Sequence, residues 1–447
     1  MKRTMNLTTD PVPSLVRAIA VPASVGFFFN TMFNVVDTYF AGLISTQALA
    51  ALSLSFPVFF IILALGSGVS TGTTALIATS LGAGDTARAR MMAVQGVAFG
   101  VLLAAAVTAL GLVLSPWLFS LLGASGDYLD LCLQYMNPIF WGSGFFILNY
   151  MLNAVLNAQG DTVSFRNFLI ISFFLNCLLD PWLMYGWLGL PAMGITGIAL
   201  ATVLIQLTGC LYLGNRVRLT ELMCRDCLKE IAPSPRAFGE IIGQGLPTSL
   251  NFVTVGLGVF VITYFVSAFG REAVAAYGVA TRVEQIMLLP AIGLNIATVT
   301  IVAQNNGARQ FARISETVRT ALAYGGAFMA AAGIVLFIAA GSLMRLFTGD
   351  GAVVGIGTFY LRIAAFVLYS YVILYVNVAA LQGVKKPGYG LFIGVLRQIA
   401  LPLIVFPLFS RVMNLGLAGI WWGIFAITWS AAIITSFYAR ARLKALR

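Results

Sequence analysis

The sequence predicts an all-α integral membrane protein with twelve transmembrane helices, arranged as two parallel-repeat six-helix bundles around a central cleft. Three observations predict this fold. The chain is 60% hydrophobic and only 9% charged, whereas a soluble domain carries roughly 25% charged residues. Long apolar segments follow one another along the chain, and its second half repeats the first. The composition excludes a soluble enzyme, a nucleic-acid-binding protein and a disordered chain.

Each predicted helix is an apolar segment long enough to cross a bilayer, which takes about 20 residues at about 1.5 Å of rise each. Turn sequences such as GAGD, GASGD and NNGARQ separate the segments. We do not expect the polar residues before the first segment to be a signal peptide, because no cleavage site follows them. The predicted spans are residues 14–43, 47–80, 91–114, 128–158, 163–187, 193–215, 239–269, 273–306, 315–341, 352–383, 388–410 and 414–439.

The Lys and Arg residues indicate the orientation. Twelve spans place both chain ends on one side, and that side carries 20 of the 26 Lys and Arg residues, against three on the other. The last three, Arg282, Arg362 and Arg397, fall inside or at the ends of spans, and Arg362 is near enough to a helix end to snorkel. Because cytoplasmic loops carry the excess of positive charge, we expect a multi-pass protein of the plasma (inner) membrane with both termini cytoplasmic.

The chain matches itself at an offset of 225 residues, without a gap over the first two helices of each half. Six helices in each half make the repeat parallel, with its axis along the membrane normal. We predict an N-terminal lobe over residues 1–215, a cytoplasmic linker over 216–238 and a C-terminal lobe over 239–447. Two similar bundles suit a transporter that works by alternating access. The matched pairs include Pro22 and Pro247, Ser24 and Ser249, Gly68 and Gly293, and Arg88 and Arg313.

An ionisable residue inside a span is expensive and is therefore a functional candidate. Asp37 and Asp180 each lie six residues before the outer end of a span, roughly 9 Å below the surface. Asn176 lies one turn deeper than Asp180, and Thr202, on the next helix, lies at about the same depth as Asn176. Such oxygen ligands suit sodium or a shared proton.

A structural role is the alternative for both acids. Asp180 could satisfy a backbone group at the kink made by Pro181, and Asp37 could pair with Thr38 or Tyr39. The repeat argues against this, because Asp37 aligns with Ile262 and the fold does not need an acid there.

Other polar residues on the spans are candidates for a substrate cleft. Asn149, Asn153 and Asn157 recur every four residues, and they either bond neighbouring helices or line the cleft. Arg282 and Glu284 are two residues apart, so they do not face each other on a helix and each needs another partner. Either could bind substrate, or both could be structural pins between the halves.

Several kinds of chemistry lack their motifs. The chain has no histidine. It also has no Walker A sequence, so direct use of ATP is not expected. Cys224 and Cys227 form a lone CxxC, whereas a zinc site needs four ligands. We therefore expect no cofactor besides a coupling ion, H⁺ or Na⁺, and no enzymatic activity.

The sequence resembles the multidrug and toxic compound extrusion (MATE) family over about residues 14–440. The resemblance is carried by AVPASVGFFFNTMFNVVDTYFAG, PVFFIILALGSGVSTGTTALIATSLGAGD, NAVLNAQGDT, NCLLDPWLMYG, GLPTSLN and ALQGVKKP. The aspartate of DTYFAG and the NxxxDP motif are similar to the branch named after DinF. The resemblance implies two six-helix lobes with a V-shaped cleft. It also implies a cation site at Asp37, Asn176, Asp180 and Thr202, which would be a metal site only if sodium is the coupling ion.

The resemblance further implies a secondary active multidrug efflux antiporter, which expels cationic, aromatic drugs and dyes in exchange for protons or sodium. The alternative is a flippase of lipid-linked oligosaccharides, for which cationic residues should line the cleft and hold a pyrophosphate. The carboxylate pair favours protons, and the Asn and Thr oxygens favour sodium. The expected partners are small cationic molecules and membrane lipid, without nucleic acid, and we expect a monomer.

Overall fold

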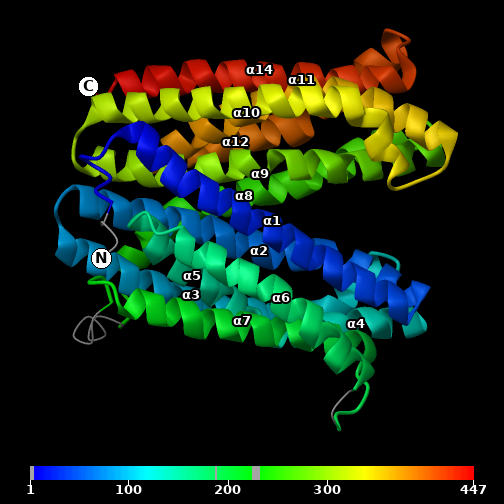
Figure 1. Cartoon of the computed structure of the whole chain (residues 1–447), viewed down its shortest axis with the longest axis horizontal. Helices are drawn as coiled ribbons and strands as arrows, with labels where there is room; N and C mark the ends of the chain where they lie inside the picture. Colours follow the sequence, from blue (N-terminus) through cyan, green and yellow to red (C-terminus); the bar gives the residue numbers. More distant parts are fainter. Residues whose placement is uncertain (1–4, 187–188, 224–231, 447) are drawn as a thin grey trace. The chain divides into compact units, whose positions relative to one another are not determined.

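The computed structural model describes residues 5–186, 189–223 and 232–446, and within these ranges every regular element is a helix (Figure 1). The helices are α1 (Val12–Ile44), α2 (Thr46–Gly82), α3 (Thr86–Leu121), α4 (Gly126–Trp141), α5 (Ser143–Ala158), α6 (Val163–Tyr185), α7 (Gly194–Arg218), α8 (Pro235–Ser267), α9 (Arg271–Gly307), α10 (Phe311–Arg345), α11 (Gly351–Gly383), α12 (Gly388–Val395), α13 (Leu401–Pro407) and α14 (Gly416–Lys444). Two π-helical turns, η2 (Leu396–Ala400) and η3 (Leu408–Val412), continue α12 and α13.

The predicted twelve-span architecture is confirmed. In the described ranges, 11 helical segments are long and apolar enough to cross a membrane, and the bent pair α4 and α5 makes up to 12. The segment from α12 to η3 counts as one span. Most helices extend a few residues past the predicted ends, because the helical backbone continues beyond the apolar residues that define a span.

The predicted span 128–158 is broken into α4 and α5, which are bent by 46°. Pro138 lies in the last turn of α4, where it removes a backbone donor from the helical ladder. Gly142 follows at the bend, and a Cβ built on it would overlap Val203 of α7. The break thus combines a proline with a glycine that permits close packing against α7.

The chain divides into two compact units by its internal contacts. Unit 1 comprises Met1–Ser24 with Leu250–Arg447, and unit 2 comprises Val25–Ser249. These limits differ from the predicted lobes 1–215 and 239–447, because they fall inside α1 and α8 and not in the linker. Each unit therefore contains the beginning of one of these two helices and the remainder of the other.

Hydrogen bonds explain why the beginning of α1 belongs to unit 1. Asn305 Nδ2 donates to the carbonyl of Leu7 at 3.0 Å, and Arg313 Nη2 donates to that of Asp10 at 2.6 Å. Leu15, Val16 and Ile19 of α1 are buried in the core of unit 1.

The beginning of α8 is held in unit 2 by residues of the first half. Gln95 Nε2 donates to the carbonyl of Ala232 at 2.8 Å. Arg88 forms an ion pair with Glu240 at 2.8 Å. Arg88 and Arg313 are counterparts in the repeat, so the same arginine of each half secures the first helix of the other half.

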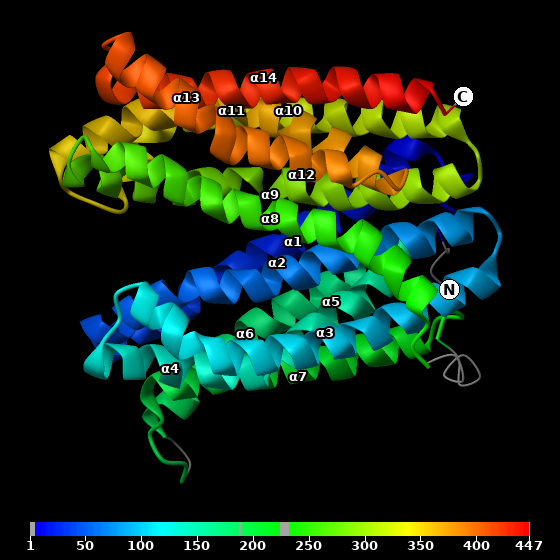
Figure 2. The same cartoon turned by 180° about the vertical axis from the view of Figure 1, so that it is seen from behind.

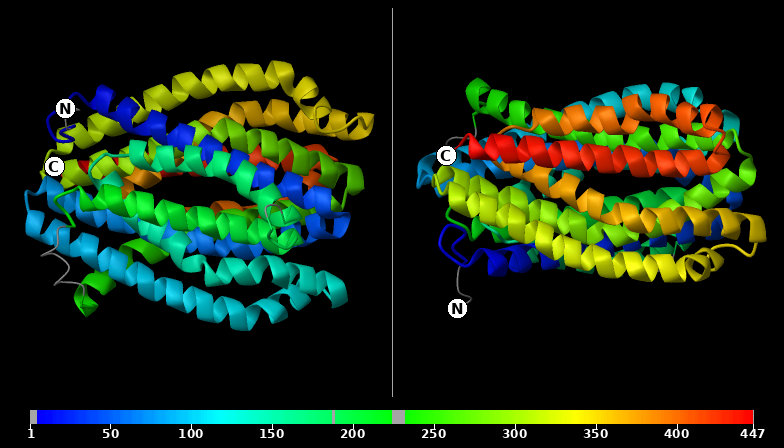
Figure 3. Two further views of the ribbon diagram at one scale, coloured as in Figure 1. Left: turned by 60° about the horizontal axis from the view of Figure 1, so that its bottom comes forward. Right: turned by 90° about the horizontal axis from the view of Figure 1, so that it is seen from above.

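Within unit 2, α5 is the central helix and packs against α2, α3 and α7 (Figure 2). Most of its side chains are buried. Within unit 1, α11 has the central position and packs against α9, α10 and α14. Figure 3 shows the green-to-red helices of this unit running alongside one another.

Two tight helix crossings follow the repeat. In unit 2, a Cβ built on Gly68 of α2 would overlap Ser249 of α8. In unit 1, a Cβ built on Gly293 of α9 would overlap Ser24 of α1. Gly68 and Gly293 are repeat counterparts, and so are Ser24 and Ser249, so each crossing joins a glycine of one half to a serine of the other.

Candidate functional site

The predicted acids of α1 and α6 meet in the interior of unit 2. The side-chain amide of Asn176 donates to Asp37 Oδ1 at 2.8 Å and to Asp180 Oδ1 at 3.0 Å. All three side chains are buried, with Asn176 and Asp180 at 0% and Asp37 at 5% exposure. The alternative pairing of Asp37 with Thr38 is wrong, because the Thr38 hydroxyl donates to the carbonyl of Asn34.

This cluster contains more acceptors than donors. Asp180 Oδ2 and Asn176 Oδ1 are buried without a hydrogen-bond partner. A buried acceptor that lacks a donor is costly, and an ionised carboxylate offers acceptors only. A proton or a small cation would relieve both deficits. The cluster has two acids, and in the described ranges no group of three or more Cys, Asp or Glu side chains converges as metal ligands do.

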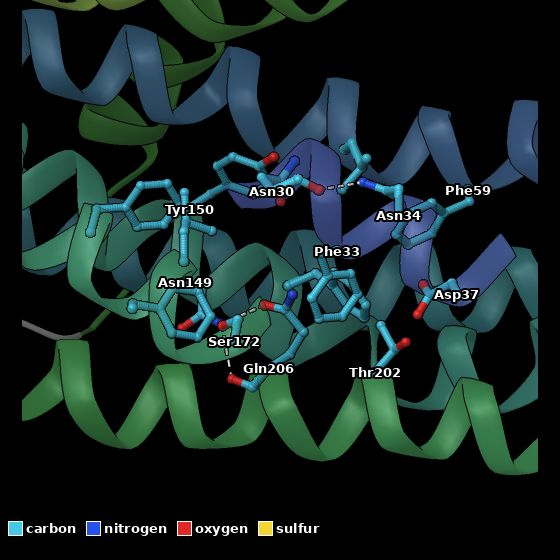
Figure 4. Close-up of a pocket in the computed structure, with 15 residues that line it drawn as sticks. Asn30, Phe33, Asn34, Asp37, Phe59, Asn149, Tyr150, Ser172, Thr202 and Gln206 are labelled. Carbon is cyan, nitrogen blue, oxygen red and sulfur yellow. Dashed lines mark hydrogen bonds between the residues drawn. The ribbon is translucent and has the colours of Figure 1, made fainter. Parts of the chain in front are cut away.

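Asp37 and Thr202 line a cavity of about 50 Å³ in unit 2 (Figure 4). They lie at one end of it, and Asn149 and Tyr150 lie at the other. A water needs roughly 10–15 Å³ of such space, so the cavity admits a few waters or a small cation and is too small for a drug. The Thr202 hydroxyl donates to the carbonyl of Ile198 at 3.1 Å, and its oxygen keeps lone pairs for a ligand.

The cavity contains polar residues that the sequence reasoning missed. Asn30, Asn34, Ser172 and Gln206 all line it. The sequence held a usable signal, because residues 30, 34 and 37 share one face of α1, and residues 172, 176 and 180 share one face of α6.

The three asparagines of α5 are all buried, but they do not share one environment. Asn149 lines the cavity, and its amide donates to the carbonyl and to Oε1 of Gln206 at 2.9 and 2.8 Å. Asn149 Oδ1 has no partner. Asn153 and Asn157 do not line this cavity.

Arg282 and Glu284 lie in unit 1 and point to different surroundings. Glu284 is buried and accepts a hydrogen bond of 2.6 Å from the Tyr360 hydroxyl, whereas Arg282 is exposed. Arg397, in the π-helical turn η2, stacks over the ring of Tyr371 at 5.3 Å. The prediction that Glu284 needs a partner other than Arg282 is confirmed. Cys224 and Cys227 lie outside the described residues.

A repeated, all-helical, multi-pass protein with a buried acidic cluster beside a polar cavity has the features of a membrane transporter. The sequence pattern of the MatE family matches the chain twice, at residues 22–182 and 247–408. The chain therefore belongs to the multidrug and toxic compound extrusion family. The two matches begin 225 residues apart, which confirms the offset of the internal repeat.

Three relatives cover most of the chain. The FAD transporter of Shewanella oneidensis is 27% identical over 90% of this chain and 89% of its own length. The probable multidrug resistance protein NorM of Thermotoga maritima is 27% identical over 94% and 91%. The multidrug export protein MepA of Staphylococcus aureus strain N315 is 26% identical over 97% and 95%.

Solved structures share the whole fold. The crystal structure of MATE in complex with MaL6 aligns with a TM-score of 0.93 and 25% identity, covering 100% of this chain and 99% of that one. A MOP superfamily transporter from Pyrococcus furiosus aligns with a TM-score of 0.93 at 24% identity, with the same coverage.

Proposed function

We propose that this protein is a secondary active multidrug efflux antiporter that exchanges protons or sodium for cationic, aromatic drugs and dyes. The observation that carries the proposal is the buried pair Asp37 and Asp180, bridged by the amide of Asn176, with Asp180 Oδ2 and Asn176 Oδ1 left unpaired. The names of two relatives, a multidrug export protein and a probable multidrug resistance protein, support the substrate class. Membership of the DinF-like branch remains a prediction.

The cavity beside Asp37 supports a cationic ligand over an anionic one. Among the described side chains that line it, none is basic, and its polar groups are amides, hydroxyls and one carboxylate. A flippase for lipid-linked pyrophosphates would need basic groups. Arg282 and Arg397 do not line the cavity, and Arg397 is stacked on a tyrosine. Because this cavity is too small for a lipid headgroup, its lining bears on the coupling ion, and the names of the relatives favour drug efflux over the flippase alternative.

In the proposed cycle, a proton or sodium ion reaches Asp37 through the cavity and is shared with Asp180. Thr202 and Asn176 would supply further oxygens if the ion is sodium. Binding removes one negative charge from the pair, so the pair needs less solvation and its packing between α1 and α6 can change. α1 can respond by bending, because it contains Pro22. The ion and the drug are thus bound in alternation, which couples efflux to the ion gradient.

We also propose a plasma (inner) membrane location with both termini cytoplasmic, and a monomeric protein. Two features of unit 1 support placing both ends on one side. The carbonyl of Leu7 accepts a hydrogen bond from Asn305 Nδ2 at the end of α9. Leu443, near the end of α14, packs with Val302 and Ile314 beside that same turn. The excess of Lys and Arg on this side favours the cytoplasm.

The proposal is tested by ethidium efflux from proteoliposomes with a proton gradient and a sodium gradient imposed separately. We expect one gradient to drive efflux by the wild type, and the same gradient to fail with Asp37→Asn. Asp127→Asn, which removes an exposed carboxylate at the start of α4, is the matched control and should transport normally. Efflux by Asp37→Asn at the wild-type rate, or no response of the wild type to either gradient, would contradict the proposal.

A further inference from the structure

An apolar groove runs along α10 and α11 of unit 1, two helices that pack side by side (Figure 1). Its volume is about 530 Å³, and its lining contains no charged residue. From Gly326 to Ile338 it follows α10 for twelve residues, or about 18 Å at the helical rise, which is close to one leaflet of a hydrocarbon core about 30 Å thick. The lining residues are Gly326, Met329, Ala330, Gly333, Ile334, Phe337, Ile338, Ala365, Phe366 and Tyr369.

Small residues of α10 create the groove and large apolar ones form its rim. A Cβ built on Gly333 would lie 2.9 Å from the carbonyl oxygen of Ala365, so the two backbones approach closely there. Ile338 is 76% exposed and Phe366 is 61% exposed. Because the chain is a multi-pass membrane protein, lipid chains are the surroundings that such a surface requires.

A positive charge stands at one end of the groove. Arg362 of α11 is exposed, and its guanidinium carbon lies 5.5 Å from the ring centre of Phe337, which lines the groove. In the described part of the chain, no carboxylate forms an ion pair with Arg362. A charged side chain facing lipid is expensive, and a guanidinium binds phosphate through paired hydrogen bonds.

The depth of Arg362 suits a lipid phosphate. It lies eleven residues after Gly351, or about 16 Å along a helix whose 33 residues span about 50 Å. Since the hydrocarbon core is only about 30 Å thick, a helix that projects equally on both sides places this position about 6 Å inside one edge of the core. The long arginine side chain can reach the headgroup level from that depth. The groove extends from there toward the middle of the membrane.

We propose that the groove is a binding site for one phospholipid, whose phosphate pairs with Arg362 and whose acyl chain lies along α10 from Ile338 to Gly326. The site is independent of the coupling cluster, which belongs to unit 2. The occupant is a membrane lipid and not a transported drug, because the lining of the groove is apolar and Arg362 stands beside the end where headgroups lie.

The test uses the full-length protein in nanodiscs with a trace of phosphatidylglycerol that carries a diazirine on its acyl chain. After illumination, we expect cross-links on residues 326–338 and 365–369. Ala330→Leu should reduce this labelling several-fold, because it fills the groove. Ala331→Leu is the matched control, since it adds the same side chain at the exposed neighbouring position that does not line the groove.

The role of Arg362 is tested by native mass spectrometry of lipid retained after detergent washing. Arg362→Gln should lose the retained phosphatidylglycerol, whereas Arg345→Gln, which removes a charge from the last turn of α10 outside the groove, should keep it. Equal labelling of Ala330→Leu and Ala331→Leu would overturn the proposal. Unchanged lipid retention by Arg362→Gln would also overturn it, because the arginine would then reach water without a lipid phosphate. A dimer that only Ala330→Leu abolishes would overturn it as well, and would assign the groove to a second copy of the chain.

Discussion

The single amide shared by Asp37 and Asp180 allows a quantitative test of whether they bind one cation together. Both accepting oxygens lie within 3.0 Å of the same nitrogen of Asn176. At a separation of about 6 Å and an effective dielectric constant of about 20, a charge on one carboxylate contributes about 3 kcal/mol to cation binding at the other. This energy corresponds to roughly a 100-fold change in affinity. Replacing either acid by asparagine should therefore weaken ion binding by about that factor.

The assay is dye efflux from proteoliposomes as a function of the concentration of the driving ion, for Asp37→Asn, Asp180→Asn and the double variant. We expect each single variant to raise the half-saturating ion concentration by roughly two orders of magnitude, so that efflux fails at the ion concentration that drives the wild type. The double variant should lose ion dependence entirely. All three variants should keep the wild-type fold, because an asparagine oxygen can still accept the hydrogen bond from Asn176. Their melting temperatures in detergent, compared with that of the wild type, test this.

Two results would refute the reasoning. If either acid can be replaced with less than about a threefold change in the half-saturating concentration, the acids do not share the ion. If Asp127→Asn shifts that concentration as strongly as Asp37→Asn does, the effect comes from the general charge of the protein and not from the buried pair.

Three further predictions concern stability. Gly68→Ala and Gly293→Ala should each lower the melting temperature markedly, because overpacking costs about 1–3 kcal/mol. Gly214→Ala is the control and should leave the melting temperature unchanged or raise it, because a Cβ there meets open space. Equal melting temperatures for all three variants would contradict the tight crossings. Asn149→Leu should destabilise unit 2 by about 1–3 kcal/mol, because it leaves Gln206 Oε1 without its donor, and an unchanged melting curve would show that the pair is dispensable. Glu240→Gln should change stability by no more than about 1 kcal/mol, since Arg88 and Glu240 are partly exposed. Any difference from the wild type should vanish in 1 M salt, where screening weakens the attraction between exposed charges. A difference that persists in salt would mean that the pair is not merely a surface contact.

The sequence was sufficient for the spans, the repeat and the meeting of Asp37 with Asp180. Hydropathy fixes where helices cross the membrane, and the helical rise fixes the depth of each residue along them. Two acids at equal depth on helices of one lobe were therefore expected to lie close together. The role of the pair in ion coupling remains a prediction.

Other features depend on which way a helix face points, and the sequence does not record this. In a membrane protein apolar side chains face both lipid and protein, so composition does not reveal that Glu284 is buried while Arg282 is exposed. The bend at Gly142 required knowledge of the neighbouring Val203. The division of α1 and α8 between two units required the hydrogen bonds that hold their first residues.

The division of α1 and α8 between the two units has a consequence for the origin of the gene and for expressing the chain as two fragments. Because each unit takes the start of one half's first helix and the body of the other half, neither half of the chain encodes a complete unit. A six-helix ancestor could have completed such a unit only as a homodimer that exchanged the start of its first helix between subunits. Gene duplication followed by fusion would have fixed that exchange within one chain. Two fragments separated between α7 and α8 would accordingly have to be made together, since each lacks a helix segment that only the other supplies.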